Sequence, residues 1–270
     1  MNSTNATPTV LKPNQAQLPA AKLKWAAALV SAGVGSLALA VWVAEANEPG
    51  AIHYPDLQTL PPYDFKIQNE SGTHRKLLRF SNAIANLGEG PMELIPHNDA
   101  STGRTDAYQS FYSHDESGNW HLVDSALVGS FVFHPQHDHW HFEDFARYEL
   151  RNVASDGSVG DRVLSSNSKV SFCLTDSVPV NSNLEHAGPQ TYDECTQLDP
   201  QGISVGWADV YSWNLYGQSL DITGLPSGQY WVVSTADPDN LIDEGSDAAE
   251  SNNGAAVKIR IKGAKVTVIR

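Results

Sequence analysis

The chain has 270 residues, of which 41% are hydrophobic, so it is long enough for one large β domain or two smaller ones. Its formal net charge of −14 at pH 7 argues against nucleic acid as a partner, because such binding depends on lysine and arginine neutralising phosphates. The charge is compatible with cationic partners, including amines and lysine-rich peptides, or with a surface that is acidic for solubility.

Residues 1–46 have the pattern of an export signal or a membrane anchor. Lys22 and Lys24 precede an uncharged run, Trp25–Ala44, which predicts an N-terminal hydrophobic helix. By the positive-inside rule, the chain that follows is placed outside the cytoplasm. Ala44-Glu45-Ala46 resembles a cleavage site, although about 20 apolar residues also suffice to span a bilayer. We therefore expect a secreted or periplasmic domain, with anchorage by residues 25–44 as the alternative and the only membrane contact.

Residues 47–64 are rich in proline and are interpreted as a linker, and residues 65–270 as one all-β domain. Short segments rich in β-branched and aromatic residues alternate with turn signals such as Asp156-Gly157. A helical period is weak and confined to Ser81–Leu87. The pattern favours a β-sandwich with long irregular loops. The expected strands are Lys76–Phe80, Met92–Ile95, Gln109–Tyr112, Trp120–Val123, Ser130–His134, Phe145–Leu150, Val163–Ser165, Lys169–Leu174, Gln229–Ser234, Ala256–Ile261 and Lys265–Ile269.

Four of the ten histidines lie in the stretch His134-Pro-Gln-His-Asp-His-Trp-His141. Alternate residues of a strand share one face, which would group His137, His139 and His141. In a straight strand the outer two are about 13 Å apart, too far for nitrogens that must each lie ~2 Å from one metal ion. The segment must therefore bend or end a strand. The pattern predicts a metal site, which could be catalytic or structural, with a surface histidine ladder as the alternative.

The two cysteines, Cys173 and Cys195, are expected to form a disulfide, since an exported domain is oxidised and no second soft-ligand motif is present. Lys169 lies in an apolar segment without an acidic neighbour, and Tyr211 lies two residues from Asp209, which on a strand would share its face. A lysine at a strand end and a buried core tyrosine are the ordinary interpretations of such residues.

A loop between Asp237 and Asn253 collects oxygen ligands of the kind that calcium prefers, without the spacing of an EF-hand. Solvated acidic loops are common, so the loop alone indicates a calcium site only weakly.

Several of these features occur together in one family. The region from about Pro55 to Lys262 resembles the catalytic domain of the lysyl oxidases, which are copper-dependent amine oxidases. The resemblance is carried by four stretches in the same order. They are KLLRFSNAIANLGEGP (Lys76–Pro91), HPQHDHWHFEDFARYEL (His134–Leu150), SKVSFCLTD (Ser168–Asp176) and QGISVGWADVY…LDITGLPSGQYWV (Gln201–Val232).

The resemblance implies roles for individual residues. The copper ligands fall on His137, His139 and His141, and His134 is assigned a supporting position beside them. The residues that cross-link into lysine tyrosylquinone fall on Lys169 and Tyr211. Asp209 is a candidate general base or orienting residue, from its spacing alone. The resemblance also strengthens the calcium site, for which the candidate ligands are Asp56, Glu244, Asp247, Asn252 and Asn253, with Glu250 as a rival.

The implied activity is the oxidation of primary amines to aldehydes, with O₂ as oxidant and release of ammonia and hydrogen peroxide. In that chemistry copper and O₂ oxidise the ring of Tyr211, and the neutral amine of Lys169 adds to it. The substrate would be peptidyl-lysine or a small amine. Two alternatives stay open: a secreted, calcium-stabilised binding module with a structural metal, and a family member that binds copper but forms no quinone.

Overall fold

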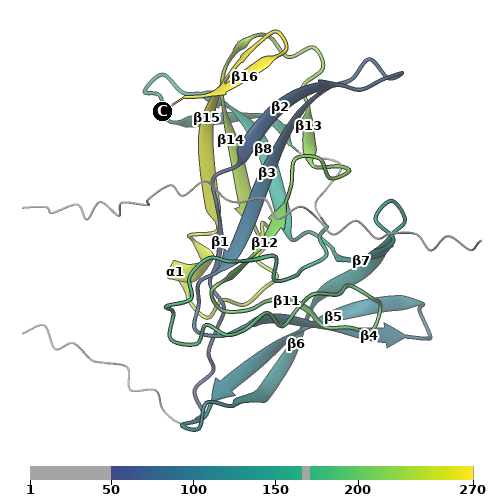
Figure 1. Ribbon diagram of the computed structural model, residues 1–270, viewed down its shortest axis with the longest axis vertical. Coiled ribbons are helices and arrows are strands. Elements are labelled where there is room, and N and C mark those ends of the chain that lie inside the picture. Colours follow the sequence, from purple (N-terminus) through teal and green to yellow (C-terminus); the bar gives the residue numbers. More distant parts are fainter. Residues whose placement is uncertain (1–49, 166–170, 270) are drawn as a thin grey trace, which may run out of the picture. The chain divides into compact units, whose positions relative to one another are not determined.

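The computed structural model describes residues 50–165 and 171–269, and the regular secondary structure in this part of the chain is almost entirely β-strand, as predicted. The strands form three antiparallel sheets (Figure 1). The run Trp25–Ala44, with its predicted N-terminal helix, lies outside the described residues, and so does Lys169. None of the helices within the described ranges has the length and apolar character needed to cross a membrane.

The first sheet is built around β3, a strand of 11 residues that pairs with four others. Two of them, β1 and β2, begin within the stretch 47–64 that the sequence analysis interprets as a linker. The predicted strand Lys76–Phe80 is only the first half of β3, and the weak helical period at Ser81–Leu87 falls on its second half, so that period was misleading. The sheet contains β1 (Leu57–Thr59), β2 (Tyr63–Asn69), β3 (Lys76–Asn86), β10 (Val178–Pro179), β12 (Trp207–Tyr211) and β13 (Ser219–Asp221).

The second sheet carries the histidine motif at its edge, in the strand order β11-β4-β5-β6-β7. The predicted strands Trp120–Val123 and Ser130–His134 are the two ends of a single strand, β6. Its members are β4 (Met92–Asp99), β5 (Arg104–His114), β6 (Trp120–His134), β7 (His139–Phe142) and β11 (Gln201–Ile203).

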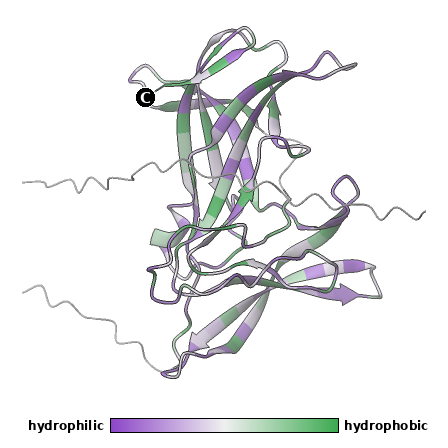
Figure 2. Cartoon of the chain, in the orientation of Figure 1, coloured by the Kyte–Doolittle hydropathy of each residue, from purple (hydrophilic) through white to green (hydrophobic). Residues whose placement is uncertain are grey.

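The third sheet faces β3 across the main core, in the order β16-β15-β14-β8-β9. Phe80 of β3 packs edge-on against Tyr148 of β8 at 5.0 Å between ring centres. Hydrophobic residues are prominent along β3, β14 and β15 (Figure 2). Its members are β8 (Ala146–Val153), β9 (Val159–Ser165), β14 (Gly228–Ala236), β15 (Gly254–Lys262) and β16 (Lys265–Val268).

Irregular chain fills most of the interval from Ser171 to Pro200, where β10 is the one strand. The predicted strand Lys169–Leu174 is partly outside the described residues, and its described part forms only an isolated bridge between Phe172 and Phe142. The described residues contain one short α-helix, α1 (Asp247–Glu250), within the acidic loop.

Candidate active site

The histidine motif lies on the hairpin between β6 and β7. His134 ends β6 and pairs with His139, the first residue of β7. The amides of His137 and Asp138 each donate a hydrogen bond of 2.9 Å to the carbonyl oxygen of His134, which closes the turn. Asp138 has a φ of 60°, in the left-handed region that aspartate enters more readily than β-branched residues. The turn thus supplies the bend that three alternating histidines on a straight strand would lack.

The bend brings three imidazoles together. His139 and His141 are alternate residues of β7, and His137 joins them from the turn. One ligand atom from each histidine lies within 4.8 Å of the other two, and the ring centres are separated by 5.6, 5.1 and 4.8 Å. His141 is buried, and its Nδ1 lies 3.2 Å from the Ser171 hydroxyl, so the Nε2 atom is the one near His137. This set of nitrogen donors fits a copper or zinc ion.

His134 packs against this group from the end of β6. Its ring stacks on that of His141 with centres 4.7 Å apart and planes within 19°, and it lies 4.5 Å from the ring of His137. The arrangement suits the supporting position expected for His134, which remains a prediction.

The outer edge of β7 is covered by chain from the irregular segment. Phe142 and Phe172 exchange two backbone hydrogen bonds of 2.8 and 2.9 Å, and the amide of Trp140 donates to the carbonyl of Cys195 at 2.9 Å. Cys173 and Cys195 form a disulfide, which confirms the predicted pairing. The disulfide therefore links two parts of this covering segment covalently, next to the histidines.

Asp209 and Tyr211 lie on β12 and meet the same segment. The Tyr211 hydroxyl is 2.5 Å from Oδ2 of Asp209 and 2.5 Å from the carbonyl oxygen of Cys173. Burial, and then the negative charge of Asp209, raise the pKa of Tyr211 well above its usual value. The Ser177 hydroxyl donates to the other carboxylate oxygen of Asp209 at 3.0 Å. Tyr211 is consequently held as a protonated phenol.

One cleft of about 310 Å³ joins these two groups of residues. The histidine hairpin forms one wall, and Tyr211 with Asp209 forms another, so residues far apart in the sequence face a common space. The lining residues are His137, His139, His141, Cys173, Thr175, Ser177, Asp209, Val210, Tyr211 and Leu215.

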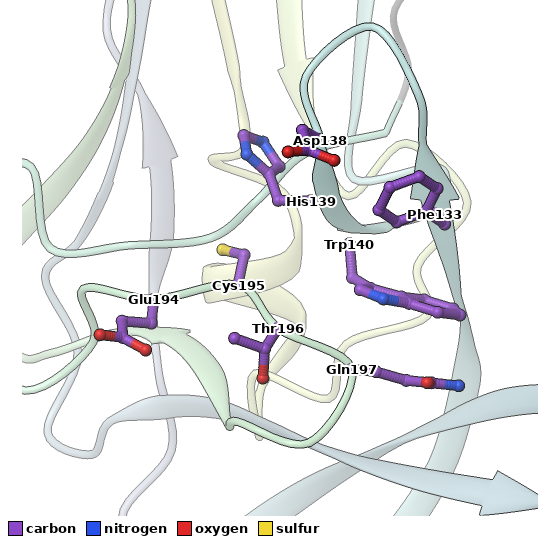
Figure 3. Close-up of a pocket in the computed structure, with 8 residues that line it drawn as sticks. All are labelled: Phe133, Asp138, His139, Trp140, Glu194, Cys195, Thr196 and Gln197. Atoms are coloured by element: carbon purple, nitrogen blue, oxygen red, sulfur yellow. The ribbon is translucent and has the colours of Figure 1, made fainter. Parts of the chain in front are cut away.

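A second hollow, of about 380 Å³, borders the first at His139 (Figure 3). Phe133 and Trp140 supply aromatic surface, and Asp138 and Glu194 supply carboxylates. An organic cation would find both apolar contact and negative charge there.

The predicted calcium ligands gather elsewhere, where the start of the domain meets the acidic loop. The Asn252 side chain donates to Oδ1 of Asp56 at 2.9 Å, and that of Asn253 donates to Oε1 of Glu244 at 2.5 Å. Glu244 is buried and also accepts from the Leu57 amide at 2.5 Å. Four of the five candidates named from the sequence therefore form two contacting pairs.

Asp247 is exposed at the start of α1, and the structure does not bring it into this group. Glu250 and Asp237 take part instead, since their carboxylates and that of Glu244 lie within 4.8 Å of one another. Sequence reasoning missed Asp237, although the tight Asp237-Pro-Asp-Asn turn marked it. Its buried carboxylate accepts from the amides of Leu241 and Ile242 at 3.0 and 2.8 Å.

Burial makes these carboxyl groups hard to ionise. It raises the pKa of Glu244 to about 8 and that of Asp237 to about 6, with the nearby Glu250 adding to both shifts. A hard divalent cation would satisfy the clustered oxygens, so the group fits calcium.

Comparisons with known proteins place the chain in a family. A family model described as lysyl oxidase matches residues 116–270. Lysyl oxidase homolog 2 of Gallus gallus is 30% identical over 194 residues, which cover 72% of this chain and 19% of that protein. Lysyl oxidase homolog 3B of Danio rerio is 26% identical, and lysyl oxidase homolog 2 of Homo sapiens is 28% identical, with the same shares covered.

The chain thus spans about a fifth of the length of these relatives. The family match nevertheless extends over more than half of the chain and includes both walls of the cleft, the hairpin and β12. The chain belongs to the lysyl oxidase family.

Proposed function

We propose that this protein oxidises primary amines, either peptidyl-lysine or small amines, to aldehydes. One amine, one O₂ and one water would yield one aldehyde, one ammonia and one hydrogen peroxide. The observation that carries the proposal is the cleft in which three clustered histidines face a buried Tyr211–Asp209 pair.

His137, His139 and His141 would hold copper, and Tyr211 with Lys169 would furnish the lysine tyrosylquinone. Bound copper and the quinone would supply the oxidising power and an electrophilic carbonyl carbon for the amine. The protein's own contribution is orientation and proton transfer. Asp209 lies 2.5 Å from the Tyr211 hydroxyl, so its carboxylate would be near an amine held at that ring and would accept the proton lost from the amine's α-carbon.

The neighbouring hollow supports an amine as the substrate. Asp138 and Glu194 would attract an ammonium group toward His139, and Phe133 and Trp140 would contact its carbon chain (Figure 3). The disulfide suits an oxidising, extracytoplasmic location for this chemistry.

The test looks for the covalent cross-link, for the quinone and for peroxide. After exposure to copper and air, peptide mapping should recover Lys169 and Tyr211 joined, with a positive redox-cycling quinone stain and peroxide release on addition of primary amines. Lys169→Arg should keep copper and lose all three signals, because a guanidinium stays protonated and cannot add to the ring. Tyr211→Phe should behave likewise, since oxidation starts from the phenolic oxygen.

Tyr192→Phe is the matched control, because Tyr192 is also buried but donates to Glu93 at 3.1 Å, away from the cleft. It should retain all signals. Recovery of Lys169 and Tyr211 in separate unmodified peptides from active protein would refute the mechanism. Metal without a chromophore would instead favour a structural site or a family member that forms no quinone.

A further inference from the structure

A second group of histidines lies outside the cleft, where three segments remote in the sequence meet. His53 precedes β1, His114 ends β5, and His186 lies in the irregular chain between β10 and β11. The ring of His186 is 5.0 Å from that of His53 and 4.4 Å from that of His114. Trp120, the first residue of β6, contacts all three at 4.7 to 5.7 Å between ring centres.

The separations of the His186 ring from the other two rings are close to those expected around a single ion. A nitrogen about 2 Å from a tetrahedral metal puts the centres of two ligand rings about 5 Å apart. The candidate copper ligands are separated by 4.8 to 5.6 Å. The second group spans 4.4 to 6.2 Å.

His53 is held rigidly in this group. Its amide donates to the Tyr112 carbonyl at 2.8 Å, and Gly90 packs closely against its backbone carbonyl group. A Cβ at residue 90 would lie 2.0 Å from the His53 carbonyl oxygen, so only glycine fits there. The imidazole is 5% exposed.

The His53 imidazole has a carboxylate near one of its ring nitrogens. Its buried Nδ1 has no hydrogen-bond partner among the described residues, and Oε2 of Glu89 lies 3.5 Å away. Metal-binding histidines usually direct one ring nitrogen to a carboxylate and bind the ion through the other. Glu89 could serve in this way, which would leave Nε2 as the ligand atom.

We propose that His53, His114 and His186 form a second binding site for a divalent transition metal of the zinc and copper class. Their nitrogens must turn toward one another, and His114 and His186 are only partly buried, which leaves room for that rotation. A metal there would join the chain just before β1, the β5–β6 hairpin and the irregular chain between β10 and β11.

Zinc stoichiometry of the full chain tests the proposal without any oxidation chemistry, so its outcome is independent of the proposed activity. With calcium in excess, wild-type protein should bind two zinc ions. His114→Gln/His186→Gln should bind one, and His139→Gln/His141→Gln should lose the other. His97→Gln is the control, because His97 stacks on Tyr108 and belongs to neither group.

A second measurement reports where the metal binds. Copper(II) quenches tryptophan emission at contact range, so the Trp120 component should be quenched in wild type. That quenching should be absent from Trp120→Phe and from the His114→Gln/His186→Gln variant. Retention of two zinc ions by that variant, or a wild type whose single zinc disappears with His139 and His141, overturns the second site.

Discussion

Asp209 is the residue whose surroundings best define a chemical role. It is buried in the wall of the cleft, with the Tyr211 hydroxyl on one carboxylate oxygen and the Ser177 hydroxyl on the other. Two fixed donors hold the carboxylate in one orientation, which a general base requires.

Asp209→Asn should lower amine turnover by about 10²–10⁴-fold, the usual contribution of a general base, with copper content unchanged. Peroxide release, measured beside quinone content, separates a base from a residue that only orients Tyr211 during cofactor formation. Ser177→Ala is the control, because it removes one hydrogen bond and leaves the charge, so its turnover should change only a few-fold. Near wild-type turnover in Asp209→Asn would exclude both roles.

Part of this site could be predicted at the level of single residues. The spacing of Asp209 and Tyr211 on one strand put them on the same face, and the structure shows that pair in contact. Asp237 could not be found in the same way, because its partner Glu244 reaches it only through the folding of the acidic loop.

At the scale of elements, the β6–β7 hairpin decides whether the histidines converge. Sequence periodicity located the histidines on one face but could not supply the turn, which depends on Asp138 adopting a φ of 60°. The same limitation split β6 into two predicted strands. Asp124, Ser125 and Gly129 resemble turn residues, yet all three pair with β5 across local bulges.

Asp138→Val should weaken copper binding, because a β-branched residue in the left-handed conformation costs roughly 1–2 kcal/mol and would open the turn that places His137. Asp138→Gly and Asp138→Asn tolerate that conformation and should bind copper with nearly wild-type affinity. Copper titration of the three variants checks this order. Equal affinity in all of them would show that the turn is not the determinant.

At the scale of the whole molecule, the acidic group ties the first residues of the domain to its last strands. Asp56 and Leu57 contact Asn252 and Glu244, which are close to them only in the folded chain. For the same reason the acidic loop alone indicated this group only weakly, and its candidate ligands came from the family resemblance. The cluster of His53, His114 and His186 had no local signal in the sequence.

Without calcium, stability should fall as the pH rises. Glu244 and Asp237 bind protons more tightly in the folded chain, with pKa values of about 8 and about 6. The stability that these two groups contribute is fully present at a pH below their ordinary pKa values. It is lost as the pH rises through their pKa values in the folded chain. Calcium should reverse the trend, adding about 2.7 kcal/mol at one hundred times its dissociation constant.

Melting temperatures from pH 5 to 9, with calcium or a calcium-selective chelator, measure this dependence. Glu250→Gln should reduce the response to calcium, whereas Asp247→Asn should keep it, because Asp247 is exposed and outside the carboxylate group. The same melting temperature with and without calcium at every pH would show that this group does not bind calcium.

The covering of β7 also bears on self-association of the chain. β7 ends its sheet, and an uncovered terminal strand can accept a strand from another copy of the chain. Here Phe172 and the Cys195 carbonyl occupy its free backbone groups, and the disulfide holds that cover in place. Reduction should therefore promote self-association through β7, detectable by light scattering as a concentration-dependent increase in mass. In this protein the disulfide would thus act as a safeguard against aggregation, in addition to closing a loop.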